Sequence, residues 1–110
     1  MQVAMTAGAF ALALTLGMST AASGAEATCT LRVKSGNLTS YRDGVTPGTC
    51  VVPSLRDHVD NIAAGNRAGW GSWGVFRASD CTGTEIADGL GESDYIPPLT
   101  FGSIRLFTCP

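Results

Sequence analysis

The chain of 110 residues contains a single histidine, His58, so any acid–base or nucleophilic mechanism built on an imidazole must use it. Asp57 and Asp60 flank it, and a base held by a carboxylate is conceivable. No nucleophile signature such as G-x-S-x-G is present, and no lysine follows the glycine-rich segment 69–74 as a phosphate loop requires. The sequence therefore predicts no enzymatic activity, and these charges are expected to face water at the start of a strand.

The glycine-rich segment has the most unusual local composition, because it places Trp70 and Trp73 in a flexible turn. Two interpretations remain open. One or both indoles could fold back to cap a core that has few large residues. Alternatively, an exposed tryptophan could anchor a contact with protein or carbohydrate, since aromatic residues dominate interface hot spots.

A second candidate contact is the run Tyr95-Ile-Pro-Pro-Leu99. Two consecutive prolines favour an extended, rigid ridge with few hydrogen-bond donors, which suits a groove on another molecule. An ordinary long connection would have the same composition, so this alternative also remains open. The predicted binding residues are Trp70, Trp73, Tyr95, Pro97 and Pro98.

The start of the chain differs from the rest. Residues 3–20 form an apolar run without charge, residues 21–25 are small, and every charged residue, cysteine and proline lies at or after Glu26. This pattern predicts a secretory signal peptide over residues 1–25. We therefore expect a secreted, extracellular protein with one mature domain, residues 26–110. A domain of roughly 85 residues buries too little surface for a large multi-substrate enzyme.

The four cysteines are Cys29, Cys50, Cys81 and Cys109. They lack the C-x-x-C spacing typical of zinc sites, so no metal or other cofactor is predicted. An even number in a short exported chain indicates disulfides, and four cysteines allow three pairings. We expect Cys29 with Cys50 and Cys81 with Cys109, because each bridge would then close one half of a two-part domain. Each closed loop would stabilise the fold by about 3 to 4 kcal/mol.

Short alternating or β-branched runs between Gly, Pro, Asn and Asp signals predict an all-β domain. The expected strands are residues 28–34, 38–42, 50–53, 59–64, 73–77, 85–87, 94–96 and 103–108. The expected turns include residues 35–37, 43–44, 47–48, 65–66, 82–83 and 88–89. Such short strands predict a two-sheet Greek-key sandwich that its disulfides hold closed.

The segment Phe76-Arg-Ala-Ser-Asp-Cys81-Thr-Gly83, with Ser103 further along the chain, resembles the βγ-crystallin Greek-key motif. In that family the aromatic residue packs on a folded-over hairpin, the glycine takes a backbone conformation that other residues resist, and the serine ties the hairpin down. Cys81 stands where an aromatic is usual, so the resemblance implies that a disulfide pins the hairpin. Similar residue order in the two halves suggests a degenerate tandem of one motif.

Residues 55–107 look like small secreted actinobacterial βγ-crystallin-type proteins, among them the Streptomyces metalloproteinase-inhibitor family and related killer-toxin-like proteins. Calcium-binding members carry two half-sites rich in Asn, Asp and Ser. Here residues 56–61 have Arg56 in place of a ligand, and residues 98–103 keep neither acidic position. Calcium needs six to eight oxygen ligands, so no tight calcium site is expected.

Together these features predict a secreted, non-enzymatic module that binds another protein. The resemblance implies a peptidase inhibitor whose partner is a secreted protease. The alternative is an adaptor subunit or toxin component of a secreted antibacterial complex, bound to a larger subunit. The net charge is −2, and the basic residues are scattered from Arg32 to Arg105. Nucleic acid and membrane surfaces are therefore not expected partners, because both call for a clustered basic face.

Overall fold

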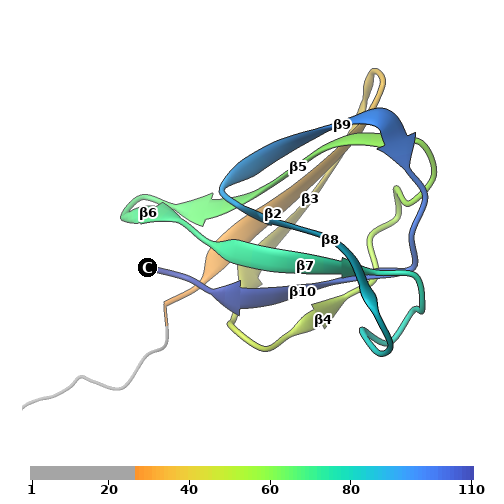
Figure 1. The fold of residues 1–110 in the computed structure, drawn as a ribbon. Helices are drawn as coiled ribbons and strands as arrows, with labels where there is room; N and C mark the ends of the chain where they lie inside the picture. The colour runs from red at the N-terminus through yellow and green to blue at the C-terminus, as the bar shows by residue number, and fades with distance from the viewer. Residues whose placement is uncertain (1–26) are drawn as a thin grey trace, which may run out of the picture.

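A computed structural model describes residues 27–110, which form two antiparallel β-sheets (Figure 1). The predicted signal peptide lies outside these residues. In the described part there is no helical segment with the length and apolarity needed to cross a membrane. The strands are β2 Cys29–Ser35, β3 Leu38–Val45, β4 Cys50–Val51, β5 Val59–Asn66, β6 Gly69–Trp70, β7 Ser72–Phe76, β8 Glu85–Leu90, β9 Glu92–Leu99 and β10 Ser103–Thr108. The predicted all-β, two-sheet fold is confirmed.

The two halves of the described chain, β2 to β6 and β7 to β10, exchange strands. A five-stranded sheet has the order β3-β2-β5-β6, and β9 also pairs with β5; the four-stranded sheet has the order β4-β10-β7-β8. Each sheet thus contains one strand contributed by the other half, β9 in the first and β4 in the second. This order is consistent with the predicted Greek-key sandwich and tandem. In the first half β2 lies between β3 and β5, and in the second half β7 lies in the same way between β8 and β10.

The core lies between the sheets and is built by strand alternation. In β2, Cys29, Leu31 and Val33 are buried, whereas the residues between them are partly exposed. Successive side chains of a strand point to opposite faces, so one face of each sheet becomes apolar. Trp73 and Ile104 of the four-stranded sheet are fully buried as well. Burying a large apolar side chain stabilises the fold by about 2 to 3 kcal/mol.

The predicted disulfide pairing is wrong. Cys29 bonds to Cys109 and Cys50 bonds to Cys81, each with Cα atoms 5.9 Å apart. The prediction assumed that each half closes on itself. Instead β4, which carries Cys50, pairs with β10 of the other half, and the end of the chain returns to the start of β2 (Figure 1). Both bridges therefore join one half to the other.

The connection between β7 and β8 is tied to the sheet by the Ser103 side chain and by a disulfide. The buried Ser103 hydroxyl accepts a hydrogen bond of 2.9 Å from the Cys81 backbone N–H and donates one to the Ala78 carbonyl. Gly83 has a φ of 85°, which favours glycine. The Cys50–Cys81 disulfide fixes the same segment to β4.

Candidate functional site

The predicted ridge is a bulge in β9. Leu99 pairs with Val59 and Asp94 pairs with Asn61, so residues 95–98 stand opposite the single residue Asp60. Such an insertion bends a strand and re-aims its side chains. Ile96 is 96% exposed, and the two prolines that follow it are exposed too. We call residues 95–98 the proline ridge; the sequence prediction named its prolines but missed Ile96, the most exposed large apolar side chain of the described residues.

Packed residues hold both ends of the ridge. The ring of Tyr95 meets Trp73 edge-on, with ring centroids 6.4 Å apart and planes at 68°. At the other end Leu99 packs against the core. Tyr95, a predicted contact residue, is therefore half-buried and serves as an anchor, while Ile96 is presented between two fixed points.

The Tyr95 hydroxyl is buried and has no hydrogen-bond partner within the described residues. Burial raises the pKa of Tyr95 to about 12; the Ser93 side chain is near enough to lower it in part but makes no well-formed hydrogen bond with the hydroxyl, and the negative charge of Asp88 raises it further. Loss of water around an ionised phenolate is the dominant cause. The phenol is neutral at physiological pH, so the Tyr95 side chain adds no charge to the base of the ridge.

The two tryptophans have different roles. Trp73, a predicted binding residue, is fully buried, and its indole N–H donates a 3.1 Å hydrogen bond to the Gly91 carbonyl. It is a core residue and is not available for contact, which confirms the folding-back alternative for this side chain. Trp70 is 61% exposed, and its role as a contact anchor stays a prediction.

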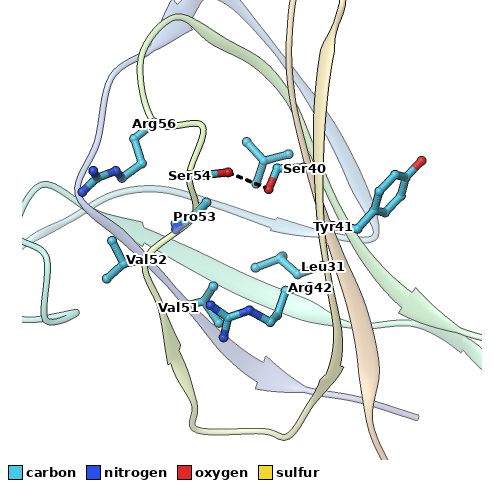
Figure 2. A pocket seen from close by; sticks show the side chains of 10 residues that line it. Leu31, Ser40, Tyr41, Arg42, Val51, Val52, Pro53, Ser54 and Arg56 are labelled. Carbon is cyan, nitrogen blue, oxygen red and sulfur yellow. Dashed lines mark hydrogen bonds between the residues drawn. The ribbon is translucent and has the colours of Figure 1, made fainter.

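A groove that the sequence did not predict lies between β3 and the segment after β4 (Figure 2). It has a volume of about 370 Å³. The buried side chains of Leu31, Val33 and Val51 lie at its base. The hydroxyls of Ser40 and Ser54 meet across it at 3.1 Å. The groove opens beside β3 because β3 is the last strand of its sheet.

Arg42 and Arg56 line this groove, which we call the arginine groove. Arg42 is the cross-strand partner of the inward-facing Leu31, so it points to the inner side of the sheet edge. Within residues 27–110, neither guanidinium has a carboxylate at ion-pair distance, since the one ion pair found there joins Arg32 to Glu92. The two arginines lie fourteen positions apart in sequence, and no local pattern links them.

His58 lies in an exposed turn with a φ of 54°. Its backbone N–H donates a 3.3 Å hydrogen bond to the Thr100 hydroxyl, and its carbonyl accepts one of 3.0 Å from Ser35. Across the part of the chain that the structure describes, no group of three or more His, Cys, Asp or Glu side chains is placed to hold a metal ion. The backbone of His58, not its ring, makes these contacts.

Comparisons of the chain with protein-family models, with curated proteins and with solved structures found no match. The functional conclusion therefore depends on the proline ridge, the arginine groove and the exposed aromatic residues themselves.

Proposed function

We propose that this protein is a secreted, non-enzymatic protein-binding module that acts as a peptidase inhibitor through the proline ridge. The observation that carries the proposal is Ile96, which is 96% exposed between the packed Tyr95 and Leu99. An exposed isoleucine gains its burial free energy, about 2 to 3 kcal/mol, only when a partner covers it. Because the flanking residues are already fixed, binding costs little ordering of the backbone.

The ridge has the properties of a segment that occupies a cleft without rearranging. Pro97 and Pro98 lack backbone N–H groups and restrict φ, so the ridge offers apolar side chains in a stiff backbone. A peptidase cleft binds extended segments through side-chain pockets, and Ile96 would fill an apolar one. The two disulfides are typical of a small extracellular domain and keep the scaffold under the ridge from yielding.

Inhibition is tested with purified protein against a panel of secreted metallo- and serine peptidases. We expect inhibition of at least one peptidase at micromolar concentration, and Ile96→Ala to weaken it about 10- to 100-fold, because an anchor side chain of this size contributes about 1.5 to 3 kcal/mol. Leu38→Ala is the matched control, since Leu38 is 61% exposed but lies on β3. A panel that the protein leaves unaffected would contradict the inhibitor proposal.

The arginine groove favours a second candidate, an adaptor subunit or toxin component that docks a larger chain of a secreted antibacterial complex. Two guanidiniums that have no carboxylate partner among residues 27–110, above an apolar base, suit an extended acidic segment with apolar side chains. The same preparations separate the candidates. A stoichiometric partner that co-purifies from culture supernatant, is lost with Arg42→Ala/Arg56→Ala and is retained with Ile96→Ala supports the adaptor. A captured peptidase lost with Ile96→Ala supports the inhibitor.

A further inference from the structure

The outer face of the five-stranded sheet carries two exposed aromatic rings. Arg32 pairs with Tyr41 on one side and with Ala63 on the other, so these three side chains share one row. In the next row, Gly65 pairs with Thr30 and with Trp70. Directly paired residues of antiparallel strands point to the same face. Figure 2 shows the consequence for β3, where the Tyr41 ring points away from the arginine groove.

Between the two rings lies a shallow trough of about 240 Å³, which we call the aromatic trough. Tyr41 is 66% exposed and Trp70 is 61% exposed, and both line it. Its floor includes the small residue Ala63, and Gly65 beside it lies beneath the Trp70 indole. Two aromatic walls over a floor of small residues provide a surface for a flat ligand.

Trp70 is held in place despite its exposure. A Cβ added to Gly91 would lie 2.8 Å from the indole Cγ, and one added to Gly65 would lie 3.0 Å from Cε3. The indole therefore rests directly on the backbone of two glycines. No side chain larger than hydrogen fits beneath it at either position without a shift. A ring fixed in this way needs no ordering when a ligand stacks on it.

The polar groups beside the trough are tied together by hydrogen bonds, and the carboxylates of Glu92, Asp43 and Asp94 outnumber the Arg32 guanidinium, so an anionic ligand is disfavoured. Arg32 is the one charged side chain among the residues that line it, and its guanidinium lies 2.8 Å from the Glu92 carboxylate. Asn61 on β5 donates a 2.9 Å hydrogen bond to Glu92 and accepts one of 2.7 Å from Arg32, so it holds the Arg32–Glu92 pair from a second strand. At the rim of the trough, the Thr30 hydroxyl donates a 2.8 Å hydrogen bond to the Asp43 carboxylate. The ligand that fits is neutral and rich in hydroxyl groups.

We propose that the aromatic trough is a binding site for a neutral glycan chain. The apolar C–H face of a pyranose ring stacks on the indole of Trp70, because the negative face of an aromatic ring attracts such hydrogens. A second sugar meets the Tyr41 ring, and hydroxyl groups between them bond to Thr30 and to the Arg32–Glu92 pair. Apolar stacking combined with a few placed polar groups is the composition of sites for small ligands.

This site is separate from the proposed inhibitory contact. Trp70 pairs at the C-terminal end of β5 through Gly65, whereas Leu99 of the ridge strand pairs at its start through Val59. The six residue steps between them correspond to about 20 Å along the strand. Figure 1 shows β6 and the end of β9 at opposite ends of the sheet. A glycan on the trough would leave Ile96 free, so the two activities can be lost independently.

The test titrates the purified protein with neutral hexasaccharides: cellohexaose, laminarihexaose, chitohexaose and mannohexaose. Tryptophan fluorescence is the readout, because Trp70 is exposed and the buried Trp73 contributes a constant background. We expect at least one hexasaccharide to shift the emission saturably. Trp70→Phe keeps part of the stacking surface and should weaken binding less than Trp70→Ala, which should weaken it about 10-fold or more.

Two further variants, Tyr41→Ala and Phe107→Ala, separate a loss of glycan binding from a loss of folding. Tyr41 is well exposed, so its replacement should lower affinity several-fold with no change in thermal stability. Phe107, 42% exposed on the four-stranded sheet, is the matched aromatic control and should bind as the unchanged protein does. Binding of the variants is measured by calorimetry. The proposal is overturned if no hexasaccharide binds at millimolar concentration, if binding survives Trp70→Ala and Tyr41→Ala, or if polygalacturonate binds and the neutral sugars do not.

Discussion

Tyr95 combines a ring that anchors the proline ridge with a hydroxyl that gains nothing from its position. The ring packs against Trp73, while the buried oxygen has no hydrogen-bond partner among residues 27–110. An unsatisfied buried hydroxyl costs free energy, whereas its replacement by hydrogen leaves the packing intact. Tyr95→Phe should therefore be as stable as the unchanged protein at pH 7, or more stable by about 1 kcal/mol, in urea unfolding.

The raised pKa of Tyr95 predicts that the free energy of unfolding falls at alkaline pH. The pKa of Tyr95 is about 12 in the folded protein because of burial, against 10.0 for an ordinary tyrosine. The unfolded chain therefore loses its proton first, and stability that is fully present below pH 10 is lost as the pH rises toward 12. For a half-exposed ring we expect a loss of about 1 kcal/mol.

Urea unfolding at pH 8 and pH 11.5 measures this difference, and Tyr95→Phe is its control because it has no proton to lose. The other ionisable groups are common to both proteins. If the variant lost as much stability as the unchanged protein between the two pH values, the alkaline loss would not belong to Tyr95.

The two tryptophans show where residue-level prediction stops. Trp70 and Trp73 lie three positions apart in one glycine-rich segment, yet one is exposed and the other fully buried. The chain leaves the five-stranded sheet and enters the four-stranded sheet at Gly71. A Cβ there would lie 2.6 Å from the Thr108 carbonyl oxygen, so the crossing needs glycine. The sequence identified the glycine-rich segment, but composition alone does not say that a sheet boundary falls between the indoles.

At the scale of elements, the connection between β7 and β8 depends on one hydroxyl. Ser103 is fully buried and bonds to the backbone of both Cys81 and Ala78. Ser103→Ala leaves the buried Cys81 N–H and the partly buried Ala78 carbonyl unsatisfied, so it should lower the free energy of unfolding by about 1 to 2 kcal/mol. Thermal or urea unfolding with the disulfides intact measures the loss.

Ser40→Ala is the matched control, because Ser40 bonds to the exposed hydroxyl of Ser54 and not to buried backbone. We expect its replacement to change stability by less than about 0.5 kcal/mol. Equal losses for Ser40→Ala and Ser103→Ala would show that the tie made by Ser103 does not hold the connection.

Strand positions were largely predictable because alternation and β-branched residues mark them, and 103–108 agrees with β10 residue for residue. Their ends were harder. The expected turn at residues 88–89 lies inside β8, and the chain turns at Gly91, which has a φ of 80°. Gly91 is also the glycine beneath Trp70. Two glycines close in sequence satisfy the same turn rule, and only tertiary packing against the indole decides between them.

At the scale of the whole molecule, the exchange of strands between the two halves determines the disulfide pairing and the position of the arginine groove, which local sequence patterns do not predict. Cys29 was expected to pair with Cys50 because each bridge would then close one half of a two-part domain. In the structure the bridges span 80 and 31 residues. In the chain-entropy model, loops of these lengths stabilise the fold by about 4.5 and 3.5 kcal/mol. The arginine groove belongs to this scale too, since β3 and the segment after β4 meet only because β4 joins the other half's sheet.

Interlocking predicts that neither half folds alone. A site-specific protease sequence inserted between Arg67 and Ala68, in the exposed turn between β5 and β6, would divide the chain close to the boundary between its halves. Without reductant the cut protein should stay joined, because both disulfides cross between the pieces, and should keep its β-sheet circular dichroism. On reduction the pieces should separate and unfold, since the five-stranded sheet then lacks β6 and β9 and the four-stranded sheet lacks β4. The uncut insertion protein is the control, and release of a free half from the cut protein under denaturing, non-reducing conditions would contradict the cross-half pairing.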